Sequence, residues 1–185
     1  MSALDSLIAA FEGLGIRYLI GGSLASSARG VPRSTMDVDV LAAMHVEQAD
    51  QLAAALGRAW YADPGDMRRA ISVGRAFNVI HMRTGEKFDV FPASGEFHAS
   101  ELRRATEIPL ELAGSRTVCR VATAEDILLA KLQWYRLGGE VSERQWSDIL
   151  GILAANADLD LGYLNQWSAR LDLGDLWERA RREAG

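Results

Sequence analysis

The sequence predicts an α+β fold in which a mixed β-sheet core with flanking helices is followed by a C-terminal helical tail. Runs of β-branched and aromatic residues, separated by glycine turns, lie within the first 121 residues, and two pairs of them have hairpin spacing. Beyond residue 122, apolar residues recur at intervals of three and four, which is typical of amphipathic helices. We therefore expect a core over residues 1–121 and a helical subdomain over residues 122–185 packed on it.

Each element of the core has a local reason in the sequence. Leu4, Leu7 and Phe11 share one face of a first helix, which Gly13 ends. Pro64 suits the first turn of a later helix, because an N–H group is not needed there. The expected elements, in order, are helix 2–13, strand 16–20, a helix from residue 23, a strand around residues 37–41, helix 46–56, strand 58–61, helix 64–72, and the hairpins 77–82 with 87–91 and 108–112 with 117–121.

The tail is predicted to contain only helices. Thr123 is a good helix cap, acidic residues follow it, and Gly138 ends the helix. A second helix begins at Ser142, and two more span residues 161–171 and 173–184. Several tryptophans alternate with leucines at helical spacing, which favours packing in the core or between helices: Trp134, Trp146, Trp167 and Trp177.

Two aspartates one residue apart, Asp37 and Asp39, are the most informative feature of the chain. The valines around them predict a strand, in which residues i and i+2 point to the same side. Two neighbouring carboxylates repel each other, and a divalent cation removes that repulsion. Their oxygen atoms suit Mg²⁺, with Mn²⁺ as the alternative ion. Taken alone, the same alternation is also the ordinary pattern of a half-buried edge strand.

A third carboxylate lies on a later predicted strand. Asp89 interrupts the apolar run 87–91, where Phe88 and Val90 share the opposite face. If the two strands are neighbours, Asp89 joins Asp37 and Asp39. Three carboxylates on adjacent strands can hold two metal ions around an in-line phosphoryl displacement.

The glycines before the first acidic strand predict an anion site. Gly21 and Gly22 lie between a predicted strand and a helix that starts at Ser23, so backbone N–H groups and the helix dipole converge there. Ser23 either caps this helix or donates a hydrogen bond to a phosphate. Arg33 carries a charged fork that suits phosphate oxygens, and the alternative for it is a salt bridge that orients Asp37 or Asp39.

In combination, these residues resemble the nucleotidyltransferase superfamily with the DNA polymerase β-like core. The string from Gly21 through Arg33-x-Thr35 to Asp39 is most similar to its abortive-infection (AbiE-type) toxin branch. The resemblance implies metal-dependent transfer of a nucleoside monophosphate from a nucleoside triphosphate to an acceptor hydroxyl. It makes three residues catalytic and metal-binding, Asp37, Asp39 and Asp89, and four residues nucleotide-binding, Gly21, Gly22, Ser23 and Arg33.

The same resemblance adds two residues of the tail to the nucleotide site. Lys131, in the segment 124–132, would contact phosphates, and Asp148, in the segment 146–149, would orient Lys131 or a substrate. The alternative is that both are exposed side chains on solvated helix faces.

The resemblance leaves the acceptor open. An RNA end is one candidate, which would make the chain a toxin with an antitoxin protein as its partner. A small molecule is the other, as in aminoglycoside-type nucleotidyltransferases. A non-catalytic nucleotide-binding or interaction domain with the same fold is the third alternative.

Composition narrows the class of protein. The net charge of −5 over 185 residues argues against bulk binding to long nucleic acid. The single cysteine, Cys119, excludes an internal disulfide, and the three histidines lack the spacing of a zinc site. Neither a signal peptide nor a membrane span is expected, and the cytoplasm is the simplest location.

Overall fold

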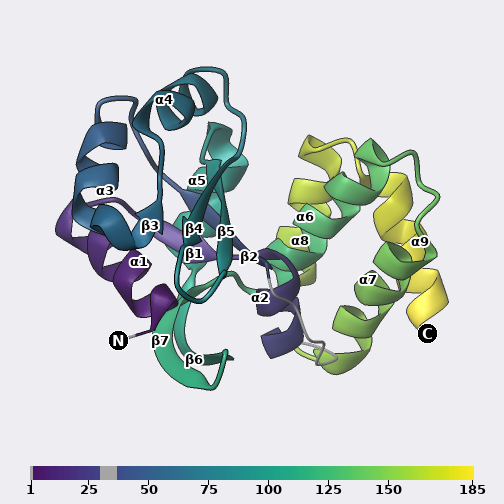
Figure 1. The fold of residues 1–185 in the computed structure, drawn as a ribbon. Coiled ribbons are helices and arrows are strands. Elements are labelled where there is room, and N and C mark those ends of the chain that lie inside the picture. Colours follow the sequence, from purple (N-terminus) through teal and green to yellow (C-terminus); the bar gives the residue numbers. More distant parts are fainter. Residues whose placement is uncertain (1, 30–36) are drawn as a thin grey trace.

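The structure is a computed structural model that describes residues 2–29 and 37–185 (Figure 1). Its strands are β1 (Tyr18–Ile20), β2 (Asp37–Ala42), β3 (Trp60–Tyr61), β4 (Phe77–His81), β5 (Lys87–Pro92), β6 (Thr106–Leu112) and β7 (Ser115–Val121). Its helices are α1 (Ala3–Gly13), α2 (Gly22–Arg29), α3 (Gln48–Leu56), α4 (Pro64–Ser72), α5 (Gly95–Arg104), α6 (Ala124–Leu137), α7 (Glu143–Ala155), α8 (Leu161–Arg170) and α9 (Gly174–Ala184), and a short 3₁₀ helix covers Gly57–Ala59.

The described strands form one mixed sheet in the order β3-β4-β5-β2-β1-β7-β6. The β2–β5 and β1–β7 pairs are parallel, and the other pairs are antiparallel. Both predicted hairpins, β4 with β5 and β6 with β7, are confirmed. The predicted α+β class with a mixed sheet is therefore confirmed as well.

Helices cover the sheet from two sides. In Figure 1, α1, α3 and α4 lie on one side of the strands, and α2 with α6 to α9 lies on the other. The helix α2 packs against α6 and α7, and so joins the glycine turn to the tail. No helix in the described ranges is both long and apolar enough to cross a lipid bilayer.

Polar caps fix where several helices begin. In each case a side-chain oxygen accepts a hydrogen bond from the backbone N–H three residues later, which satisfies one of the exposed donors of the first turn. The capping residues are Ser2, Asp63, Thr123, Ser142 and Asp160.

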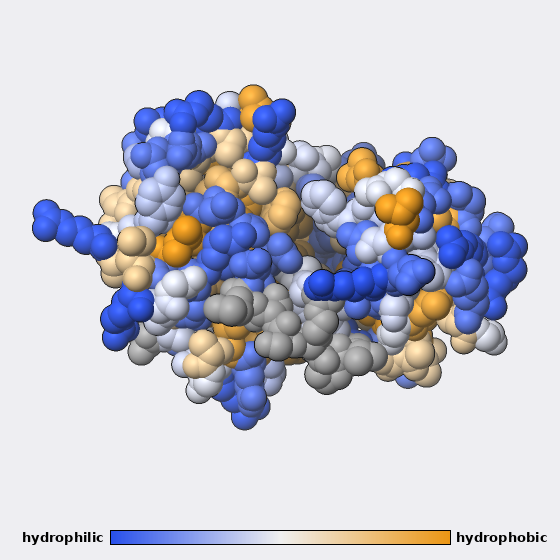
Figure 2. Space-filling view, turned by 45° about the vertical axis from the view of Figure 1, so that its right-hand side comes forward, coloured by the Kyte–Doolittle hydropathy of each residue, from blue (hydrophilic) through white to orange (hydrophobic). Residues whose placement is uncertain are grey.

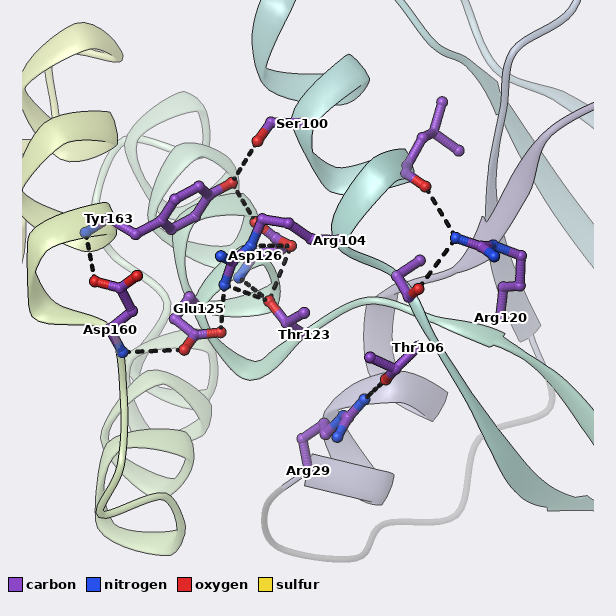
Figure 3. Close-up of polar contacts among 12 residues, drawn as sticks. Arg29, Ser100, Arg104, Thr106, Arg120, Thr123, Glu125, Asp126, Asp160 and Tyr163 are labelled. Carbon is purple, nitrogen blue, oxygen red and sulfur yellow. Dashed lines mark hydrogen bonds and ion pairs between the residues drawn. The ribbon is translucent and has the colours of Figure 1, made fainter.

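A buried carboxylate ties α5 to the tail helices (Figure 3). Asp126 at the start of α6 is fully buried and accepts hydrogen bonds from the hydroxyls of Tyr163 (2.6 Å) and Thr123 (2.9 Å). Arg104 of α5 forms an ion pair with it at 3.4 Å, and the Tyr163 hydroxyl also contacts Ser100 of α5. This network holds α5, α6 and α8 in a fixed arrangement beside the sheet.

Two features differ from the sequence prediction. Helix α5 was not predicted, because only a few apolar residues such as Phe97 and Leu102 mark its buried face. Its ends do carry helix signals, with Ser94 before it and two arginines in its last turn. The packing predicted for Trp134 is wrong: its side chain is 54% exposed, whereas the three other tail tryptophans are buried.

Candidate active site

The two acidic strands lie side by side, which is the condition under which Asp89 was expected to join Asp37 and Asp39. In the parallel β2–β5 pair, Asp39 is directly opposite Asp89, and Asp37 is opposite Lys87. The alternate residues of both strands, including Val38 and Phe88, are completely buried on the other face of the sheet. The pleat therefore brings the three predicted carboxylates to one face and one end of two adjacent strands.

The glycine turn fits against one of these carboxylates. Gly22, with φ of +56°, is so close to Asp39 that a Cβ atom at Gly22 would lie 1.6 Å from Asp39 Oδ2. The backbone N–H of Ser23 donates a hydrogen bond to the Asp39 carboxylate. The N-terminus of α2, predicted as an anion site, thus faces the acidic strand.

The surroundings of Asp39 raise its pKa above the ordinary value. Burial raises its pKa first, and the negative charge of Asp89 raises it further. The Ser23 hydrogen bond and the positive charge of Lys131 act in the opposite direction. An additional positive charge beside Asp39 would therefore stabilise its ionised form.

A lysine that was not predicted as a site residue forms ion pairs with the other two carboxylates. Lys87 Nζ lies 3.1 Å from Asp89 Oδ2 and 3.7 Å from Asp37 Oδ1. The hydrogen bond with Asp89 raises the pKa of Lys87 above its ordinary value. The second oxygen of Asp89, Oδ1, is buried, and no described residue donates a hydrogen bond to it.

The two tail residues implied by the resemblance meet each other. Lys131 Nζ on α6 and Asp148 Oδ2 on α7 form an ion pair of 2.9 Å, with side chains 14% and 27% exposed. They are therefore not two separate side chains on solvated faces. The part they take in nucleotide binding stays a prediction.

A cleft of about 700 Å³ joins the glycine turn, Asp39 and Lys131, whereas Asp37, Asp89 and Asp148 are not among the described residues that line it. It lies between the sheet and α6, and Figure 2 shows the surface hollowed between the sheet side and the tail helices. Gly21, Gly22 and Ser23 line it together with Asp39 and Lys131. Arg33, the remaining predicted nucleotide-binding residue, lies outside the described residues.

Two polar side chains of α5, the helix that was not predicted, also line the cleft. Glu101 of α5 is 6% exposed, and burial raises its pKa to about 9, with the charge of Asp126 adding to the effect. His98 Nε2 lies 4.0 Å from Glu101, while His98 Nδ1 accepts a hydrogen bond from the backbone N–H of Ser94. Burial lowers the pKa of His98. Both side chains are therefore uncharged at neutral pH. The cleft thus contains an uncharged polar pair in addition to the charged Asp39 and Lys131.

Replacing Glu101 by glutamine is expected to stabilise the protein increasingly as the pH rises from 5 to 8. The folded state holds a proton on Glu101 up to about pH 9, whereas the unfolded chain releases it near 4.5. The wild type therefore loses stability over this window, by up to about 1.4 kcal/mol per pH unit, and the glutamine variant does not. Denaturant unfolding at pH 5, 6.5 and 8 measures the difference between the two proteins.

The control is Glu107→Gln, which makes the same chemical change at an exposed position on β6. A free-energy difference between Glu101→Gln and wild type that stays constant across these pH values would contradict a buried, protonated Glu101.

Within the described ranges, no three aspartate, glutamate, histidine or cysteine side chains lie close enough together to bind one metal ion. The Lys87 ammonium group lies against two of the predicted ligands.

Comparisons with known proteins bear on the fold. No family model and no curated protein matches the chain. Among solved structures, the chain is similar to the crystal structure of ANT(2″)-Ia in complex with adenylyl-2″-tobramycin, at 16% identity over 91% of this chain and 94% of that one, with a TM-score of 0.51.

Two further structures are similar at lower TM-scores. The solution structure of the antibiotic-resistance factor ANT(2″)-Ia matches at 18% identity over 98% of this chain and 91% of that one, with a TM-score of 0.47. An antigenic nucleotidyltransferase-like protein from Paracoccidioides brasiliensis matches at 18% identity over 92% and 90%, with a TM-score of 0.46. The chain therefore shares the fold of the ANT(2″)-Ia crystal structure.

Proposed function

We propose that this chain is a metal-dependent nucleotidyltransferase that moves a nucleoside monophosphate from a nucleoside triphosphate to an acceptor hydroxyl. One observation carries the proposal: Asp39 and Asp89 are paired in register on adjacent strands, and the N-terminus of α2 closes on Asp39. Fold similarity alone does not assign an activity, whereas this arrangement supports one, because a helix N-terminus, which favours anions, lies directly beside a carboxylate pair.

The donor set fits Mg²⁺ or Mn²⁺. Carboxylate oxygens are the ligands that these hard cations prefer. Asp89 Oδ1 is a buried oxygen that lacks a donor among the described residues, and Lys87 already places a positive charge against Asp37 and Asp89. When bound, the ion would neutralise phosphate charge and act as a Lewis acid on the α-phosphate.

The residues of the chain would position the reactants. Backbone N–H groups of the glycine turn would hold the phosphates, and Lys131 would add positive charge from the other wall of the cleft. Asp89 would accept the proton of the acceptor hydroxyl. The hydroxyl oxygen then forms a bond to the α-phosphorus, the bond from that phosphorus to the bridging oxygen breaks, and pyrophosphate leaves.

A small hydroxyl compound is the acceptor that we favour. The cleft lies between the sheet and α6, and its volume of about 700 Å³ suits a small-molecule site. The similar ANT(2″)-Ia structure holds an adenylyl-2″-tobramycin. The negative net charge is a further argument against extended RNA contacts. Transfer to an RNA end, as in a toxin controlled by an antitoxin, is the competing outcome of the test.

The test uses the wild-type chain with each nucleoside triphosphate labelled at the α-phosphate, Mg²⁺, and two acceptor pools. One pool holds aminoglycosides and other small hydroxyl compounds, and the other holds deproteinised cellular RNA. Label on a small molecule with release of pyrophosphate supports the favoured acceptor, and label on RNA supports the toxin alternative. Tight triphosphate binding without pyrophosphate release in either pool would indicate a non-catalytic nucleotide-binding domain.

Replacing Lys87 by methionine is expected to lower the melting temperature in metal-free buffer by about 2–4 °C, the shift for roughly 1 kcal/mol in a domain of this size. Removing the ammonium group takes the positive charge of Lys87 away from Asp37 and Asp89. The same variant is expected to bind Mn²⁺ at least about fivefold more tightly, because the lysine no longer competes with the ion for these carboxylates. Electron paramagnetic resonance of free Mn²⁺ measures this affinity.

Arg68→Met serves as the control, because Arg68 forms an exposed ion pair with Asp50 away from the cleft. Unchanged or weaker Mn²⁺ binding by Lys87→Met would show that the lysine and the metal ion do not share these carboxylates.

A further inference from the structure

Two aromatic side chains line the same cleft as the charged residues Asp39 and Lys131. Phe91 of β5 and Trp134 of α6 both line it, and their rings meet edge to face with centroids 6.1 Å apart and planes at 68°. We refer to this pair as the aromatic shelf. It belongs to the same cleft as Lys131 and the glycine turn, so a ligand held by those groups lies within reach of it.

The position of the shelf follows from the two elements that carry the predicted phosphate and metal groups. Phe91 comes two residues after Asp89, on the same face of β5, about 6.6 Å further along the strand. Trp134 comes three residues after Lys131, on the same side of α6, about 4.5 Å along the helix axis. On both β5 and α6, a charged residue is therefore followed by an aromatic residue that lines the cleft.

The exposure of Trp134 sets it apart from the other tryptophans. Its side chain is 54% exposed, while Trp60, Trp146, Trp167 and Trp177 are at most 8% exposed. Leaving a large indole in water forgoes the free energy of burying it. Because more than half of Trp134 is open to solvent while Phe91 contacts it edge to face, the indole can be covered by a flat ligand.

We propose that the aromatic shelf binds the nucleobase of the donor nucleoside triphosphate, an inference that rests on the proposed function. A nucleoside triphosphate has a charged phosphate chain at one end and a planar base at the other. The cleft offers the matching order, from the glycine turn and Lys131 to Phe91 and Trp134. Stacking on aromatic rings tolerates any base, because every base presents a π-face.

The test compares ligands with and without a base. Wild type and Trp134→Leu are titrated calorimetrically in Mg²⁺ with each nucleoside triphosphate and with inorganic tripolyphosphate. The leucine variant is expected to bind the preferred nucleoside triphosphate roughly tenfold more weakly and to bind tripolyphosphate as the wild type does. Trp134→Phe, which keeps an aromatic face, is expected to retain most of the affinity.

Tyr61→Leu is the matched control, because Tyr61 is a half-exposed aromatic residue on β3 that does not line the cleft. Equal losses for the triphosphate and for tripolyphosphate, or no loss in Trp134→Leu, would overturn the shelf as the base site while leaving nucleotide binding intact. Failure of the wild type to bind either ligand would overturn the proposed function and the shelf together.

Discussion

Replacing Asp39 by asparagine is expected to weaken Mg²⁺-dependent binding of a nucleoside triphosphate by at least about a hundredfold without unfolding the protein. The Asp39 carboxylate lies against the N-terminus of α2, and Asp39 is opposite Asp89 in the sheet. Asparagine keeps the shape of the side chain but removes the charge that would attract the ion. Isothermal titration with and without Mg²⁺ measures the change.

The stability of this variant provides a second result. Burial and the charge of Asp89 raise the pKa of Asp39, so its ionised form costs stability above that pKa. The asparagine variant is therefore expected to be at least as stable as the wild type at pH 7. Asp50→Asn, the same change at an exposed residue of α3, is the control. Unchanged triphosphate affinity in Asp39→Asn would remove Asp39 from the site.

Replacing Gly22 by alanine is expected to weaken triphosphate binding as much as Asp39→Asn does, and also to destabilise the fold. Its Cβ atom would lie 1.6 Å from Oδ2 and 2.5 Å from Cγ of Asp39, so the whole carboxylate must move. The positive φ of +56° adds a backbone cost of about 1–2 kcal/mol for an alanine. Calorimetric titration and thermal melting together measure both effects.

Gly15→Ala separates the backbone cost from the collision. Gly15 has a similar φ of +65°, but an added Cβ would meet nothing within 4 Å. We expect Gly15→Ala to lose stability and keep its triphosphate affinity, whereas Gly22→Ala loses both. Full triphosphate affinity in Gly22→Ala would mean that the close approach of α2 to Asp39 has no part in binding.

The sequence predicted the features that depend on local pattern. The alternation around Asp37 and Asp39 and the glycine pair each have a signature within a few residues, and the structure places them as expected. The neighbouring position of Asp89 was conditional on strand pairing, and the parallel β2–β5 register confirms it. The functional roles of these residues stay predictions.

Features that depend on tertiary arrangement were not predictable in the same way. The contact of Lys87 with Asp37 and Asp89 follows from the register between two strands that are distant in sequence. The spacing of Trp134 is that of a core residue, and only the position of α6 beside the cleft leaves it exposed. Glu101 lies on a helix with weak periodicity, so its burial had no sequence signal.

The most direct test of the central claim is a thermal-shift scan of the wild type with each of the four nucleoside triphosphates, with and without Mg²⁺. A ligand that binds only the folded state adds about 2.7 kcal/mol of stability at a hundredfold excess over its Kd. We predict a clear rise in melting temperature with at least one triphosphate, dependent on Mg²⁺. No rise with any triphosphate, or an equal rise without Mg²⁺, would contradict a metal-dependent nucleotide site at Asp37, Asp39 and Asp89.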